Sequence, residues 1–151
     1  ENEGTIIELG GVKHRYHCAL SRTVYIGKPD SKIDETLKIT NEGVEKAIEN
    51  TKPGNTCHDV AVAFWSVLEK YGLEKESRCG YSIGLGYPPD WGEHTLSIRK
   101  NEKTVLYPNV TYHLMAGMWM DTWGLEISES IRVTENGCEL FCDFPRSLHL
   151  V

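Results

Sequence analysis

The chain has 151 residues, of which 40% are apolar and 25% charged, as expected for one soluble globular domain with a substantial core. The net charge of −6 and the lack of a Lys/Arg-rich run argue against a nucleic-acid partner, because phosphate backbones are bound mainly by clustered cations. No apolar stretch approaches the roughly 20 residues of a membrane-spanning helix, so no membrane partner is predicted.

The first half of the chain predicts a hairpin followed by two helices. β-Branched and aromatic residues cluster on both sides of Gly10-Gly11, which indicates strands over 4–9 and 15–26. Apolar residues then recur with helical spacing in two segments separated by Lys52-Pro-Gly. Caps are expected at Ser31 for the first helix and at Asn55 or Thr56 for the second, which should stop at Gly72.

The second half of the chain predicts strands joined by loops. Gly80–Gly92 is too rich in Gly and Pro for a regular element. Strands are expected over 95–98, 104–106, 110–119, 124–134 and 139–142. Two helices followed by a run of strands predict an α+β domain with a curved antiparallel sheet.

The five cysteines form no C-x-x-C pair, and no second pair completes a zinc site with Cys138 and Cys142. An odd number of cysteines without a disulfide framework indicates reduced thiols, which are typical of a cytoplasmic protein.

The segment Ile6–Gly27 resembles the first metal-binding hairpin of the creatinase/methionine-aminopeptidase superfamily, the pita-bread hydrolases. Its frame positions are occupied by Gly10, Tyr16, Arg22 and Thr23, and Arg22 is expected to buttress the hairpin or to pair with a carboxylate. The resemblance implies the later part of a pita-bread fold, with two helices packed on one face of the sheet. Residues 1–151 would then be a single partial catalytic domain that lacks the N-terminal domain and the start of the catalytic domain.

The metal-ligand positions of the superfamily are altered in this sequence. The two aspartates fall on Glu8 and Ala19, the histidine on Tyr81, and the two glutamates on His113 and Ser128. A two-metal site requires shared carboxylates, so the resemblance implies no metal ion and no other cofactor. A residual single-metal site through Glu8, His113 and His94 remains open.

Several longer runs resemble the ectoine-hydrolase branch of this superfamily: Arg15–Cys18 with Leu20–Thr23, Lys52–Phe64, Gly86–Thr95, Trp119–Ser130 and Pro145–Leu148. The resemblance implies a metal-independent hydrolase that opens a cyclic amidine, ectoine, to an N-acetyl-diamino acid. Such a substrate is a cation whose central carbon is already electrophilic. A metal ion would place a second positive charge beside it, whereas carboxylates, a nucleophile and a proton donor suit it.

Four residues are candidates for catalysis. Glu8 is expected to be the nucleophile or general base, although an exposed glutamate on an edge strand is the alternative. His94 and His113 are candidates for proton transfer, because the pKa of histidine lies near working pH; either could be an ordinary core or surface residue instead. Glu129 follows the altered ligand position, where the superfamily has an aspartate, and is preferred to Glu126 as the carboxylate that faces the cleft.

Five further residues are candidates for substrate binding: Tyr81, Tyr87, Trp91, Glu126 and His17. An aromatic face attracts an amidinium by cation–π interaction, and two tyrosine hydroxyls could orient it. Glu126 and Glu129 are three apart on a predicted strand, so their side chains should point to opposite faces.

Two alternatives stay open. The chain could be an Xaa-Pro-type metallopeptidase homologue with degenerate ligands, or an inactive fragment or binding module. Exposed sheet edges and apolar patches favour association, so a homodimer is expected beside the small-molecule substrate.

Overall fold

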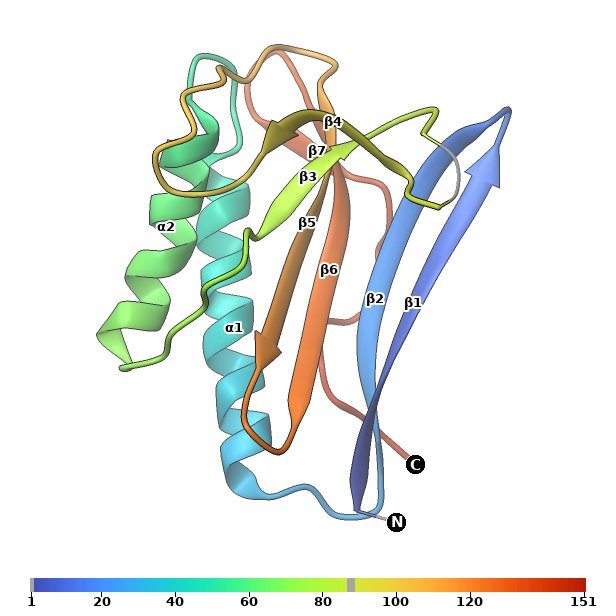
Figure 1. The fold of residues 1–151 in the computed structure, drawn as a ribbon, viewed down its shortest axis with the longest axis vertical. Coiled ribbons are helices and arrows are strands. Elements are labelled where there is room, and N and C mark those ends of the chain that lie inside the picture. Colours follow the sequence, from blue (N-terminus) through green and yellow to red (C-terminus); the bar gives the residue numbers. More distant parts are fainter. Residues whose placement is uncertain (1, 87–88) are drawn as a thin grey trace.

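The computed structural model describes residues 2–86 and 89–151 and contains two sheets and two helices (Figure 1). The elements are β1 (Glu3–Lys13), β2 (Tyr16–Ile26), α1 (Ser31–Asn50), α2 (Cys57–Lys70), β3 (Gly80–Ile83), β4 (Gly92–Ser97), β5 (Thr111–Trp119), β6 (Gly124–Val133), β7 (Cys138–Leu140) and β8 (His149–Leu150). One sheet has the order β1-β2-β8 and the other β4-β3-β5-β6-β7. The α+β prediction is confirmed. The larger sheet is antiparallel, and among the strands of the described residues only β8 pairs in parallel, with β2.

The hairpin β1–β2 turns at His14 and Arg15, which have φ values of 50° and 73°. Two central residues with positive φ match the right-handed twist of the flanking strands. The predicted turn at Gly10-Gly11 is therefore wrong, and both glycines continue β1. Gly10 has a different role: a Cβ there would lie 2.8 Å from the Trp91 ring, so glycine allows that indole to pack on β1.

The two helices begin with side-chain caps. Asp30, not Ser31, caps α1 by accepting the Lys32 backbone N–H, whereas Thr56 and Asp59 form the capping box of α2. Figure 1 shows both helices on one face of the larger sheet, as predicted. In the described part of the chain no helix is long and apolar enough to cross a membrane.

Alternation along β5 and β6 separates an apolar face from a polar one. Tyr112, Leu114, Ile127 and Ile131 belong to the core that the helices cover. Their neighbours point to the opposite face because strand side chains alternate. That second face of β5 and β6 carries buried polar side chains: His113, Glu126, Ser128 and Ser130.

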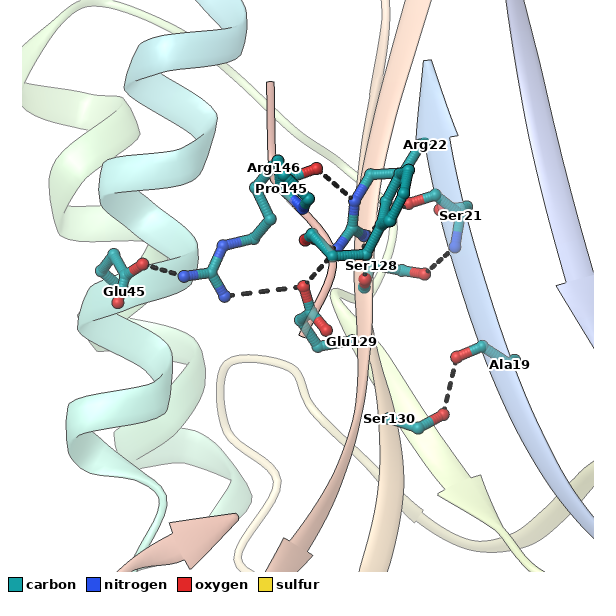
Figure 2. A network of polar contacts seen from close by, with 10 residues as sticks. Ala19, Ser21, Arg22, Glu45, Ser128, Glu129, Ser130, Pro145 and Arg146 are labelled. Carbon is teal, nitrogen blue, oxygen red and sulfur yellow. Dashed lines mark hydrogen bonds and ion pairs between the residues drawn. The ribbon is translucent and has the colours of Figure 1, made fainter. Parts of the chain in front are cut away.

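The two sheets meet where β2 runs beside β6, and hydroxyl groups replace a backbone ladder there (Figure 2). Ser128 Oγ accepts the Ser21 backbone N–H at 2.6 Å, and Ser130 Oγ donates to the Ala19 carbonyl at 2.7 Å. Thr23 Oγ1 accepts the Glu126 N–H at 2.8 Å. Short hydroxyl side chains therefore hold the hairpin against the larger sheet.

At three places the structure differs from the sequence prediction in whether a strand is present. Residues 80–83 form β3, although the segment is rich in glycine, because all four residues are buried between β4 and β5. The predicted strand at 104–106 is only a bridge between Val105 and Thr56. The pairing of β8 with β2 was not predicted, since two residues carry no periodic signal.

Candidate functional site

Four predicted site residues, from three strands and the loop before β4, meet on the polar face. Tyr81 on β3 and His113 on β5 are direct cross-strand neighbours, with the tyrosine hydroxyl 3.0 Å from His113 Nδ1. Trp91 Nε1 donates to the same hydroxyl at 2.9 Å. Glu8 on β1 places Oε1 3.9 Å from His113 Nδ1. Residues far apart in the sequence thus surround one nitrogen and one hydroxyl.

Glu126 adds a second carboxylate on this face. Its cross-strand neighbour is Gly117. The pKa of Glu8 is raised mainly by burial, and the negative charge of Glu126 raises it further. Burial also raises the pKa of Glu126 itself, while the Ser21 hydroxyl and the Lys75 charge oppose that rise. Two carboxyl groups that repel each other will bind a cation readily, because a cation stabilises both ionised forms.

Lys75 is a residue that the sequence did not reveal. Its Nζ donates to the Gly117 carbonyl at 2.6 Å and to Ser77 Oγ at 2.8 Å, and burial lowers its pKa. A cavity of about 640 Å³ opens beside it and is lined by 72–77, Gly117 and 119–121. In the sequence this lysine lies in a charged stretch that looks like an ordinary solvated loop, and only the fold brings it near Glu126.

His113 is neutral at working pH. It is fully buried, and burial lowers its pKa to about 4. Its Nε2 has no hydrogen-bond partner among residues 2–86 and 89–151. A buried neutral imidazole can orient a neighbouring group, whereas it cannot pair with Glu8 as a cation at pH 7.

This burial predicts a pH dependence of stability. Because the folded pKa of His113 lies below the usual 6.5, the unfolded chain binds more protons between about pH 4 and 6.5. The contribution of neutral His113 to the free energy of unfolding is present above pH 6.5. Roughly 3 kcal/mol of it is lost as the pH falls toward 4. We expect His113→Asn, which keeps a polar group near Nδ1, to remove this dependence.

The measurement is the difference in urea unfolding free energy between wild type and His113→Asn at pH 7 and at pH 5. The raised pKa values of Glu8, Glu126 and Glu129 act in the opposite direction, since their stabilising contribution is lost as pH rises. These groups are present in both proteins and largely cancel. An equal difference at the two pH values would contradict the burial argument.

The structure places Glu129 away from this group, which corrects the preference for it over Glu126. Glu126 and Glu129 do point to opposite faces, but Glu126 is the one on the face of Glu8 and His113. Glu129 Oε1 lies 2.7 Å from Arg22 Nη2 and 3.6 Å from Arg146 Nη1. Figure 2 shows the two arginine side chains reaching this carboxylate. Arg146 also pairs with Glu45 on α1. Two arginines thus occupy the side of β6 that Glu129 faces.

The remaining candidates lie around the group or outside it. His94 has an exposed side chain whose Nε2 lies 2.9 Å from Asp90, and its contacts do not join it to Glu8. His17 is buried on β2, and its backbone N–H donates to the Gly84 carbonyl. Tyr87 lies outside the described residues. The role of every candidate stays a prediction.

The side chains present do not fit the two-metal centre of the superfamily that this chain resembles. Ala19 offers no donor, and Ser128 Oγ is engaged by the Ser21 backbone. Within the described ranges no three His, Cys, Asp or Glu side chains gather closely enough to hold a metal ion. The donor set suits an organic cation better than a pair of divalent ions.

Comparisons with known proteins agree with the sequence resemblance. The model of metallopeptidase family M24 matches residues 1–135. Ectoine hydrolase of Halomonas elongata is 50% identical over 149 residues, which are 98% of this chain and 37% of that protein. The Xaa-Pro dipeptidase of Pyrococcus horikoshii is 25% identical over 146 residues, covering 95% of this chain and 40% of that one.

Solved structures confirm the predicted pita-bread fold. Dipeptidase PepE from Mycobacterium ulcerans has a TM-score of 0.89 at 25% identity, over 98% of this chain and 40% of that one. The X-Pro aminopeptidase from Thermotoga maritima has the same TM-score and identity, over 98% and 41%. The chain therefore spans about two fifths of the length of the proteins it matches.

Proposed function

Because the chain belongs to metallopeptidase family M24, we propose that it carries part of a hydrolytic site that opens a cyclic amidine such as ectoine without a metal ion. The observation that carries the proposal is the carboxyl pair Glu8 and Glu126, which shares a face with the neutral Tyr81–His113 pair. The 50% identity with ectoine hydrolase supports the choice of substrate.

The carboxyl pair suits an amidinium. The Glu126 charge and burial make the ionised form of Glu8 costly in the empty site. A bound cation offsets both effects, because opposite charge favours the ionised carboxylate. Trp91 adds an indole beside the same group, where a cation–π contact contributes about 0.5–2 kcal/mol. Substrate binding and the activation of Glu8 are therefore coupled.

The reaction needs only water and proton transfers. As general base, Glu8 takes a proton from water while the water oxygen bonds to the carbon between the two ring nitrogens. As nucleophile, it forms that bond itself, and water later displaces Glu8 from the same carbon. In both cases one ring C–N bond breaks, the departing nitrogen gains a proton, and the other nitrogen remains acylated. Glu8 has the same position in both mechanisms.

A single-metal mechanism is less well supported. It would require His94 beside Glu8 and His113, but His94 is exposed and paired with Asp90. The low pKa of His113 leaves it able to bind a metal, yet its Nδ1 is already in contact with the Tyr81 hydroxyl. The donor set therefore favours the metal-independent reaction.

The test is hydrolysis of ectoine, followed by NMR, in the protein at the full length of its relatives, with and without a chelator. We expect ring opening at an unchanged rate after chelation, and no cleavage of Xaa-Pro dipeptides. Two tightly bound ions, with dipeptide cleavage that chelation abolishes, would instead establish the metallopeptidase alternative. Assaying residues 1–151 alone distinguishes a partial domain from a self-sufficient one. The homodimer and the cytoplasmic location stay predictions.

A further inference from the structure

We infer that the Tyr81 hydroxyl is the proton donor to the departing ring nitrogen, and that Trp91 and His113 are positioning residues that direct its proton toward the substrate. The inference rests on the proposed function and deepens it. It adds a catalytic role for a tyrosine that the sequence suggested only as a substrate contact.

The first step is the hydrogen bonding of the hydroxyl. Indole Nε1–H can only donate, so the Trp91 contact at 2.9 Å uses a lone pair of the Tyr81 oxygen. The His113 Nδ1 contact at 3.0 Å can run in either direction, depending on the tautomer. The direction of this second bond decides where the phenolic proton points.

The burial of His113 decides the direction. Its Nε2 is buried without a partner in the described part of the chain. A proton on Nε2 would leave a buried N–H without an acceptor, and such orphaned donors are rarer than unpaired acceptors. The proton therefore belongs on Nδ1, which donates to Tyr81. With two N–H groups donating to its oxygen, Tyr81 must direct its own proton elsewhere.

The Glu8 carboxylate lies beside this hydrogen-bonded pair. Glu8 Oε1 lies 3.9 Å from the same His113 Nδ1 that contacts the hydroxyl, so carboxylate and phenol converge from opposite strands. Arg78 lies over the Tyr81 ring at 4.7 Å, and Glu8, Asp90 and Glu126 are the acidic groups around it. Burial is the largest effect on the Tyr81 hydroxyl and raises its pKa, as do the three carboxylates, whereas the Trp91 hydrogen bond lowers it. The phenol therefore keeps its proton at neutral pH and can act as the proton donor.

The proton balance closes without another reactant. Tyr81 transfers its proton to the ring nitrogen as the C–N bond breaks, and the bonding electron pair stays on that nitrogen. When Glu8 is the base, the phenolate then recovers the proton that Glu8 removed from water. When Glu8 is the nucleophile, the phenolate takes a proton from the water that hydrolyses the covalent intermediate. Each turnover therefore consumes one water and returns both residues to their starting state.

The test compares Tyr81→Phe with wild type in the full-length protein, using Tyr112→Phe as the matched control. Tyr112 lies next to His113 on β5, but its hydroxyl binds Thr51 on the helix side. We expect Tyr81→Phe to lower kcat by about 10²-fold with KM changed by less than about threefold. The control should keep wild-type kcat.

A second substrate separates proton donation from packing. With a cyclic amidine whose departing nitrogen bears an aryl ring, the leaving group is a weaker base and needs less protonation. The loss caused by Tyr81→Phe should then shrink by about 10-fold or more, because acid catalysis follows leaving-group basicity. Equal losses with both amidines, or activity within a few-fold of wild type, would overturn the inference.

The tautomer of His113 can be measured independently of turnover. The ¹⁵N chemical shifts of His113 should report a protonated Nδ1 and a bare Nε2 near neutral pH; the reverse assignment would overturn the orientation argument. A wild-type protein that opens no cyclic amidine would overturn the proposed function and this inference together. An active wild type with a normal Tyr81→Phe variant would overturn the inference alone.

Discussion

Glu8→Gln is expected to abolish ring opening in the full-length protein while leaving the fold intact. The substitution keeps the size of the side chain, and Glu8 lies on a hairpin strand that is mostly exposed, so packing should hardly respond. The amide, however, is neither a base nor a nucleophile. A loss of roughly 10²-fold or more follows for a general base, and a larger one for a covalent nucleophile.

The matched control is Glu3→Gln, which makes the same change on β1 at an exposed position. It should leave turnover unchanged. Product formation by NMR and near-UV circular dichroism check activity and fold in the same samples. Glu8→Gln activity within a few-fold of wild type would remove Glu8 from the mechanism.

Glu126→Gln tests the electrostatic side of the same argument. Glu8 must be ionised to act, so kcat/KM should fall as the pH falls through its raised pKa. Removing the Glu126 charge removes the second cause of that rise, and the acidic limb of the profile should move to lower pH. A limb that does not move would show that burial alone sets the pKa of Glu8.

Arg22→Met is expected to cost about 3–5 kcal/mol of unfolding free energy, the usual cost of removing one member of a buried ion pair. Arg22 is buried, and its five N–H groups all have acceptors. They bind Glu129 Oε1 at 2.7 Å and the carbonyls of Ser21 at 2.8 Å, Ser128 at 2.6 Å, Phe144 at 2.7 Å and Pro145 at 2.9 Å. One side chain thus ties the hairpin to β6 and to the C-terminal segment.

Arg132→Met is the matched control. Arg132 pairs with Glu139 at 2.6 Å, but both side chains are exposed, and such pairs contribute about 0–1 kcal/mol. Urea unfolding curves, each fitted with its own m value, give the loss of unfolding free energy for both variants. The double variant Arg22→Met/Glu129→Gln should lose less than the sum of the single changes, because the charge left behind is also removed. Equal losses for Arg22→Met and Arg132→Met would contradict the role of the buried network.

Local sequence signals were sufficient for the elements whose cause is local. Helical spacing of apolar residues and polar caps predict both helices, and alternation predicts β5 and β6. The hairpin was predicted but its turn was misplaced, because His14 and Arg15 adopt positive φ without the glycine that normally signals it. β3 was missed since its four residues are stabilised by neighbouring strands, not by their own propensity.

For the candidate site, too, the sequence predicted some features and left others to the tertiary structure. Altered ligand positions in the sequence pointed to Glu8, Tyr81 and His113, and the structure brings these three together. A period of two placed Glu126 and Glu129 on opposite faces, yet could not say which face held the site.

By itself the sequence determined the family, the fold class and the residue types available for chemistry, because these depend on motifs and on local periodicity. Only the tertiary structure decided which carboxylate faces the site, since Arg22 and Arg146 come from other segments to hold Glu129 on the helix side. It also brought Trp91 onto Gly10 and Lys75 near Glu126. Long-range packing sets the charge and burial around each group, and those in turn set its pKa and its chemistry.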